Sequence, residues 1–205
     1  MTDRAGLPGS AGEHELQERW GTTGRASSFY RNQVLDHLNE EMVGFVARQT
    51  MVFIATADGH GEADCSFRAG DPGFVRVLGA RLLAYPEYRG NGVHASLGNI
   101  VENPHIGLLF LDFFRDTIGL HVNGRARMGE LEGQSRSSVG EIPVDPRAER
   151  WVMVEVDEAY IHCSKHIPRL ARLDKEIDWG TDDARKKGGD YFGVKESRRA
   201  PATSD

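Results

Sequence analysis

Hydrophobic and polar residues alternate through the middle of the chain in short runs that end at turn signals. This period of two, with Gly, Pro, Asp and Asn between the runs, is typical of strands in an antiparallel sheet. We predict strands over residues 51–57, 62–68, 74–78, 81–86, 105–113, 117–131 and 151–163. Gly124 lies inside the longest of these runs, 117–131, and is expected to allow a bulge there. The last run could be one long strand or two short ones.

Helical spacing is confined to three places. Val34, Leu35, Leu38, Met42, Phe45 and Val46 recur at intervals of three and four residues, which indicates one helix, or two short ones with Asn39 as a second cap. A short helix is expected over 93–102, ended by Asn103 and Pro104. A further helix is expected in the polar link before residue 151. With about seven strands and no regular alternation of strand and helix, we predict a mainly β (α+β) antiparallel barrel.

The two ends differ in composition from the middle. Residues 1–26 are rich in Gly, Ser and charge without an apolar period, and are expected to form a disordered or loosely attached arm. Residues 174–205 form a charged tail, expected to be partly docked. The domain between them spans 27–173.

Charge and hydropathy exclude some classes of protein. A net charge of −6 argues against a nucleic-acid binder with a basic face. The chain has no long apolar run and no recognisable targeting pattern, so we expect no membrane association and a cytoplasmic location. Cys65 and Cys163 are expected to be free thiols, with Cys65 in the core.

The loop after the fourth predicted strand has the residue types of a phosphate site. The run Tyr85 to Gly92 contains Arg89, Gly90 and Asn91, and a short helix with Ser96 and Asn99 follows. Guanidinium groups and the backbone amides at a helix start bind anions. Simpler interpretations stay open, because Asn91-Gly92 is also a turn signal and Ser96 and Asn99 also suit a solvated helix face.

Two further motifs carry alternatives. Arg68 could bind a phosphate or could pair with Asp64 or Asp71. The cluster His162, Cys163 and His166 suggests a metal site, but zinc normally needs four ligands at recognisable spacing, so we predict no metal here. The segment is expected to close the barrel or line a pocket with His162 or Lys165. No nucleophile with an adjacent base is apparent.

The central block resembles the FMN-binding split-barrel proteins related to pyridoxamine 5′-phosphate oxidase. The runs that carry the resemblance are FIATAD-G, D-x-S-x-R-x-G-D-P-G-F-V, R-G-N-G with S-x-x-N-I-x-x-N-P, and V-N-G-R-A. The resemblance implies a six-stranded split barrel with flanking helices, forming a homodimer with FMN at the subunit interface. A barrel of this size has no room for a flavin in its lumen, which agrees with a site on its outer wall.

The resemblance also implies which residues hold the cofactor. The arginine-bearing strand and the loop and helix after the fourth strand supply the flavin contacts in such proteins. The residues at those positions, together with the two expected pocket residues of the C-terminal strand, are Ser66, Phe67, Arg68, Ala69, Tyr85, Arg89, Gly90, Asn91, Ser96, Asn99, His162 and Lys165.

We therefore expect an FMN-dependent oxidoreductase that transfers a hydride between a nicotinamide or small organic substrate and the flavin. The R-x-V-L-L-K strand and the C-terminal W-R-L-x-R-L motif of the vitamin-B6 oxidase are missing, so activity on pyridoxamine phosphate is not expected. The alternatives are a flavin-binding or sensing protein without turnover, or the same scaffold binding F420 or haem.

Overall fold

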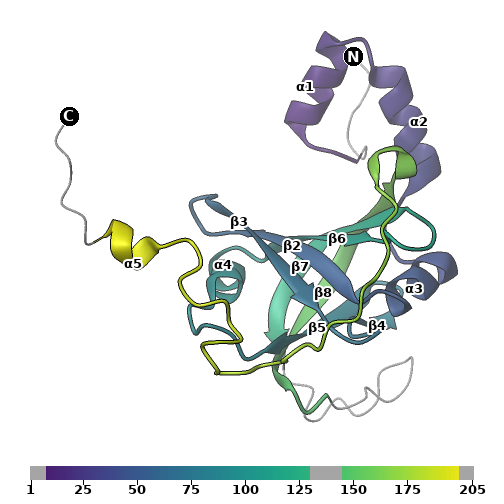
Figure 1. The fold of residues 1–205 in the computed structure, drawn as a ribbon. Helices are drawn as coiled ribbons and strands as arrows, with labels where there is room; N and C mark the ends of the chain where they lie inside the picture. Colours follow the sequence, from purple (N-terminus) through teal and green to yellow (C-terminus); the bar gives the residue numbers. More distant parts are fainter. Residues whose placement is uncertain (1–7, 130–144, 199–205) are drawn as a thin grey trace.

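A computed structural model describes residues 8–129 and 145–198 of the chain, and its centre is one curled antiparallel sheet (Figure 1). Seven strands follow one another in the order β3-β2-β6-β7-β8-β5-β4, and the two-residue strand β1 pairs with β8. The described residues thus hold eight strands, where the family resemblance implied six. The strands are β1 Val34–Leu35, β2 Met51–Ala57, β3 Ala63–Ala69, β4 Arg76–Gly79, β5 Leu82–Tyr88, β6 His105–Leu111, β7 Gly119–Gly129 and β8 Ala148–His162.

The predicted strands are confirmed within one to three residues where the structure describes them, because the alternation of side chains matches the burial pattern. In β2, for example, Val52, Ile54 and Thr56 are buried and the residues between them are not. The C-terminal run is one 15-residue strand. Residues 130 and 131 of the run 117–131 and the link before residue 145, with its expected helix, lie outside the described residues.

The bulge expected at Gly124 is present. The pairing of β7 with β8 shifts between Asn123 and Gly124. A Cβ atom at Gly124 would lie 1.9 Å from the carbonyl oxygen of Glu155. Glycine is therefore required here by the close approach of two backbones.

One apolar core fills the inside of the curled sheet. Alternate residues of β2, β5, β6, β7 and β8 meet there, and Val46 of helix α3 (Glu40–Ala47) closes one end. Asn39 caps this helix, as predicted, because its side chain accepts a hydrogen bond from the amide of Met42 at 2.9 Å. Val34 and Leu35, expected to be helical, instead pair with Tyr160 and Ala159. The helical spacing of the sequence therefore does not produce a helix at these two residues, because they form a short strand against β8.

The helix expected over 93–102 is α4 (Ala95–Glu102), which lies beside β2 and β3. Its apolar face is buried against the sheet through Leu97 and Ile100. The short helix thus starts where β3 and the loop after β5 meet, and this places its first turn at the site described below.

The N-terminal arm, where no regular structure was expected, contains helix α1 (Ala11–Arg19) and the first residues of α2 (Thr23–Gln33). Residues 27–33 of α2 lie beyond the arm, where a helical pattern was expected to begin. A capping box explains the first: Ser10 accepts from the amide of Glu13, and the Glu13 carboxylate accepts from the amide of Ser10. Neither helix contains a buried residue. Helix α2 contacts the barrel through Phe29, whose ring lies edge-on to Tyr160 with centroids 5.9 Å apart.

After β8 the chain passes a 3-10 turn, η1 (Ser164–His166), and continues without regular structure to the short helix α5 (Val194–Ser197). Figure 1 shows this C-terminal chain running along the barrel and crossing near β5 and α4 before α5 projects away. The charged tail is thus docked along part of its length.

Candidate functional site

A pocket with a volume of about 850 Å³ lies where β3, the loop after β5, the start of α4 and the C-terminal segment meet. Cofactor and ligand sites commonly have volumes of this order. Most of the residues predicted to bind a cofactor line it, although they come from three separate elements: Ser66, Phe67, Arg68, Ala69, Arg89, Gly90, Asn91 and Ser96.

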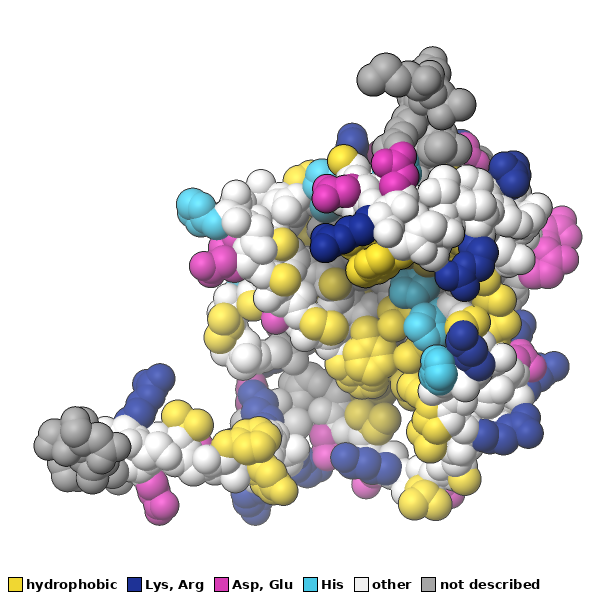
Figure 2. Space-filling view, turned by 90° about the horizontal axis from the view of Figure 1, so that it is seen from above, with side chains coloured by type: hydrophobic (Ala, Val, Ile, Leu, Met, Phe, Trp, Pro, Cys, Tyr) yellow, Lys and Arg dark blue, Asp and Glu magenta, His cyan; other side chains and the backbone are white. Residues whose placement is uncertain are grey.

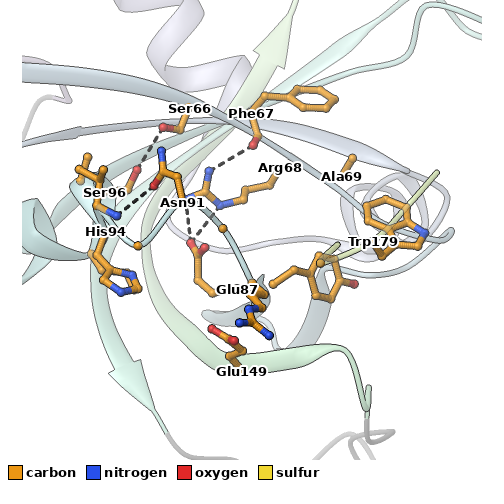
Figure 3. A pocket seen from close by; sticks show the side chains of 18 of the residues that line it. Ser66, Phe67, Arg68, Ala69, Glu87, Asn91, His94, Ser96, Glu149 and Trp179 are labelled. Carbon is orange, nitrogen blue, oxygen red and sulfur yellow. Dashed lines mark hydrogen bonds and ion pairs between the residues drawn. The ribbon is translucent and has the colours of Figure 1, made fainter. Parts of the chain in front are cut away.

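Arg68 lies in the pocket wall and is already paired. Its Nε and Nη2 atoms both lie 2.9 Å from one carboxylate oxygen of Glu87, and its Nη1 donates to the carbonyl of Phe67 at 3.1 Å (Figure 3). The side chains of Arg68 and Glu87 are 21% and 14% exposed. The partner of Arg68 is therefore Glu87 of β5, and not Asp64 or Asp71, the two residues considered from the sequence.

The two serines of the pocket share one acceptor. Ser66 and Ser96 both donate to the same oxygen of Asp64, at 3.0 and 3.2 Å, and their hydroxyl oxygens lie 3.2 Å apart. Ser96 is buried. This network joins β3 to the first turn of α4 and fixes the helix start against the strand.

The loop that leads into α4 has an unusual backbone. Gly92 and His94 both have positive φ, at 80° and 57°. Glycine adopts this conformation freely, whereas His94 is strained there, and strained residues are concentrated at functional sites. His94 is the N-cap of α4 and makes no side-chain capping hydrogen bond. Ser96 and Leu97 of the first turn line the pocket. An uncapped helix start that opens onto a pocket can bind an anion through its amides.

Two predicted residues of this region point elsewhere. Tyr85 is fully buried in the barrel core, because its position in β5 faces inward. Its hydroxyl has no hydrogen-bond partner among the described residues, and burial raises its pKa. Asn99 donates to the buried side chain of Thr56 at 3.0 Å. Tyr85 and Asn99 therefore lie behind the pocket wall and do not line the pocket.

His162 and Lys165 also lie outside the pocket. His162 contacts His121 across the β7–β8 pair, with ring nitrogens 2.9 Å apart, and His121 stacks on Tyr160 at 4.7 Å. Burial, and then the neighbouring His162, lowers the pKa of His121. Cys65 and Cys163 are free and exposed, so the expectation of a core thiol at Cys65 is wrong: it lies on the outer face of β3. No group of three metal-ligating side chains is gathered among the described residues.

Several pocket residues were not predicted. Glu87 and His94 lie in or beside the loop that was selected, but nothing in their local pattern marks them. Glu149 and Arg150 begin β8 and reach the pocket through its pairing with β5. The C-terminal segment adds a further wall, and no local signal connects it with the loop. Its lining residues are Lys175, Glu176, Ile177, Asp178, Trp179, Gly180 and Lys186.

Trp179 is held at the edge of the pocket by an aromatic and charged cluster (Figure 3). Its ring centroid lies 5.5 Å from that of Tyr88, and the Arg147 guanidinium lies 5.4 and 5.5 Å from the Tyr88 and Trp179 centroids. Asp145 accepts hydrogen bonds from both Arg147 and Tyr88. The hydrogen bond from Arg147 lowers the pKa of Asp145 to about 2, and burial raises the pKa of Tyr88 to about 12.

The comparison with protein-family models identifies the central domain. Residues 38–163, more than half of the chain, match the model described as pyridoxamine 5′-phosphate oxidase. The chain belongs to the pyridoxamine 5′-phosphate oxidase family. The family resemblance stated from the sequence is thus confirmed, and with it the split-barrel FMN-binding-like fold. None of the curated proteins compared with this chain matches it.

Solved structures with a similar fold include relatives of different kinds. A candidate pyridoxamine 5′-phosphate oxidase from Lactobacillus delbrueckii is 21% identical, with 62% of this chain and 98% of that chain covered and a TM-score of 0.46. An F420 reductase is 12% identical, with 61% and 98% covered and a TM-score of 0.38. HutZ, a haem storage protein from Vibrio cholerae, is also 12% identical, with 60% and 94% covered and a TM-score of 0.40.

Within residues 8–129 and 145–198, no helix is both long and apolar enough to span a membrane.

Proposed function

We propose that this chain is an FMN-binding flavoprotein whose pocket holds the cofactor phosphate between the start of α4, Arg68 and Arg89. The observation that carries the proposal is the uncapped first turn of α4, which opens onto a pocket lined by both arginines. Backbone amides and guanidinium groups are the donors that a phosphate dianion requires. The volume of about 850 Å³ suits a mononucleotide.

Two carboxylates in the pocket are already bonded to residues of the proposed phosphate site. Arg68 pairs with Glu87, and Asp64 accepts from Ser66 and Ser96. Each guanidinium has five N–H donors, so Arg68 can keep Glu87 and still donate to a phosphate. Glu87 and Asp64 then hold Arg68 and the serines in position, and the pocket binds an anion through donors that have fixed orientations.

We propose an oxidoreductase activity for the loaded protein. When bound, the flavin would supply hydride transfer to or from a nicotinamide or small organic substrate, and the chain would supply binding and orientation. No side chain of this chain is required as an acid or a base for that transfer.

We also propose that two copies of the chain form a homodimer through the outer face of β2, β3 and β6. The rings of Phe53 and Phe67 contact each other there at a tilt of 59°, with centroids 5.4 Å apart, next to Leu109. Seen from above in Figure 2, hydrophobic side chains gather in the middle of this side of the molecule, next to histidines. A large apolar patch on a sheet face is typical of a protein interface.

Titration of the purified protein with FMN and with riboflavin tests the cofactor. We expect FMN to bind much more tightly, because riboflavin lacks the phosphate. Equal affinities would contradict the phosphate site. Reduction of the bound flavin by NADPH, seen as bleaching, supports the oxidoreductase; an unbleached flavin after other small donors have also been tried favours a binding protein without turnover. A spectrum and mass of F420 or haem in the purified protein would replace FMN as the cofactor.

A further inference from the structure

Residues 174–187 run along one side of the pocket, and we call them the strap. They supply much of one wall, from Lys175 to Gly180 and at Lys186. Figure 1 shows this part of the chain crossing near β5 and α4 on its way to α5. A ligand that fills the pocket would therefore contact the strap.

The strap is attached to the barrel in a different way from the chain before it. Just before the strap, the amide of Leu170 donates to the carbonyl of Phe113, and the Arg169 and Arg172 side chains donate to Arg115 and Thr50. Within the strap, every backbone hydrogen bond given by the described residues is internal, such as Thr181 to Asp178 and Lys186 to Asp183. Side chains alone join the strap to the barrel, so it can move without breaking a backbone ladder.

One of these side-chain contacts occupies a residue of the proposed phosphate site. An oxygen of Asp182 lies 2.6 Å from Nη2 of Arg89, and its other oxygen lies 3.1 Å from Nζ of Lys187. The Arg89 and Asp182 side chains are 61% and 55% exposed, so their ion pair is weak. A carboxylate and a phosphate present similar oxygens to a guanidinium, and Asp182 therefore stands where a phosphate oxygen could bind.

The second attachment is Trp179. Its ring packs against Tyr88 and under Arg147, and Arg147 is held by Asp145 and Asp71. This contact lies three residues before Asp182. The strap thus has one contact on an aromatic and charged cluster and a second, exposed ion pair on Arg89.

We propose that the strap is a displaceable, autoinhibitory cover of the pocket, in which Asp182 holds Arg89 until the phosphate group of a ligand takes its place. The proposal rests on the proposed FMN site and adds its regulation. Ligand affinity then includes the cost of releasing Asp182 from Arg89, and of any change in its second contact, with Lys187.

The test compares Asp182→Asn with Asp183→Asn in the full-length protein. Asp183 is a matched control, because it lies in the same strap and pairs with Arg185, not with Arg89. We expect Asp182→Asn to tighten FMN binding by about two- to fivefold, the range for loss of a competing exposed ion pair. Asp183→Asn should bind FMN as the unchanged protein does. Riboflavin, which has no phosphate, should bind equally to all three.

The same variants in an Arg89→Ala background isolate the contact. Without Arg89 the Asp182→Asn change should have no effect on FMN affinity. The proposal is overturned if Asp182→Asn equals Asp183→Asn in the presence of Arg89, or if Asp182→Asn weakens FMN.

Limited trypsin digestion separates the strap from the cofactor assignment. If none of the variants binds FMN, the proposed function fails, and the digestion decides the strap alone. Faster cleavage after Lys175 and Lys186 in Asp182→Asn than in Asp183→Asn supports a strap held by Arg89. Equal rates would overturn it.

Discussion

Arg68 meets two requirements at the scale of a single residue. It neutralises the half-buried Glu87 carboxylate and it faces the pocket. Removing one partner of such a pair leaves the other without its charge partner, so a single substitution changes stability as well as binding. A test of its function therefore has to measure both.

Arg68→Ala is predicted to weaken FMN binding by about 1.5 to 3 kcal/mol, the range for a hydrogen bond to a charged group. Arg89→Ala is predicted to do the same. The measurement is a fluorescence titration with FMN, with the unfolding midpoint recorded for each variant. Arg68→Ala with Glu87→Ala restores charge balance and should regain stability without regaining FMN. Arg125→Ala, on an exposed side chain outside the pocket, is the control. Normal FMN affinity in both single variants would remove the phosphate assignment.

Asp145 predicts a pH dependence of stability. Its pKa in the folded protein is about 2, below the ordinary 3.8, because Arg147 donates to it. A lowered pKa contributes stability that is complete above about pH 4 and is lost as the pH falls toward 2. Urea unfolding at pH 7, 4 and 3 should show that loss, and Asp145→Asn should have a smaller one.

Asp71→Asn is the matched control for this prediction. Asp71 also accepts from Arg147 but its side chain is 71% exposed, so its loss should change the acid dependence little. If the free energy of unfolding falls equally in Asp145→Asn and in the unchanged protein between pH 4 and 3, the Arg147 contact with Asp145 is not the source of the acid dependence.

At the scale of elements, the β7–β8 pair depends on a single glycine. Gly124→Ala would place a Cβ 1.9 Å from the Glu155 carbonyl oxygen, so one strand must move. We expect a loss of about 1 to 3 kcal/mol of stability, as for overpacking elsewhere. Gly98→Ala in α4 is the control, because nothing lies within 4 Å of its added Cβ and alanine favours a helix. Thermal unfolding of both variants provides the measurement, and equal midpoints would contradict the bulge.

Helix α1 is an element that forms without burying a residue. Its capping box and the contact of Gln17 with Tyr30 are local. Deleting residues 1–20 is therefore predicted to leave the melting temperature and FMN affinity unchanged. Deleting residues 1–33 also removes the Phe29 contact with Tyr160 and should lower the melting temperature. A loss of FMN binding in the shorter deletion would show that α1 takes part in the site.

For the whole molecule, the outer sheet face predicts the assembly. We expect a dimer by light scattering, with or without FMN, because Phe53, Phe67 and Leu109 leave an apolar surface on one chain. Leu109→Arg should shift the protein toward a monomer. Val101→Arg, an exposed position on α4, should not. A stable monomer that retains bound flavin would contradict this interface.

The positions of most strands along the chain could be predicted because they depend on local features. Alternation in β2 and the Asn39 cap are properties of neighbouring residues, and the structure confirms both. The bulge at Gly124 is also confirmed, but the backbone that requires glycine there is that of Glu155 on β8. Helix α1 was not predicted, because it lacks an apolar period and is specified by a cap that the hydrophobic pattern does not record.

The sequence by itself determined the strands, the family and the loop and arginine strand that form most of the pocket wall. Only the tertiary structure decided which partners those residues have. Glu87 reaches Arg68 because β3 and β5 meet at the pocket, and Asp182 reaches Arg89 across more than ninety residues. Tyr85 does not line the pocket, because the alternation of side chains along β5 places it in the core. Local periods depend on covalent neighbours, whereas charge pairing and pocket walls depend on contacts that exist only after the chain has folded.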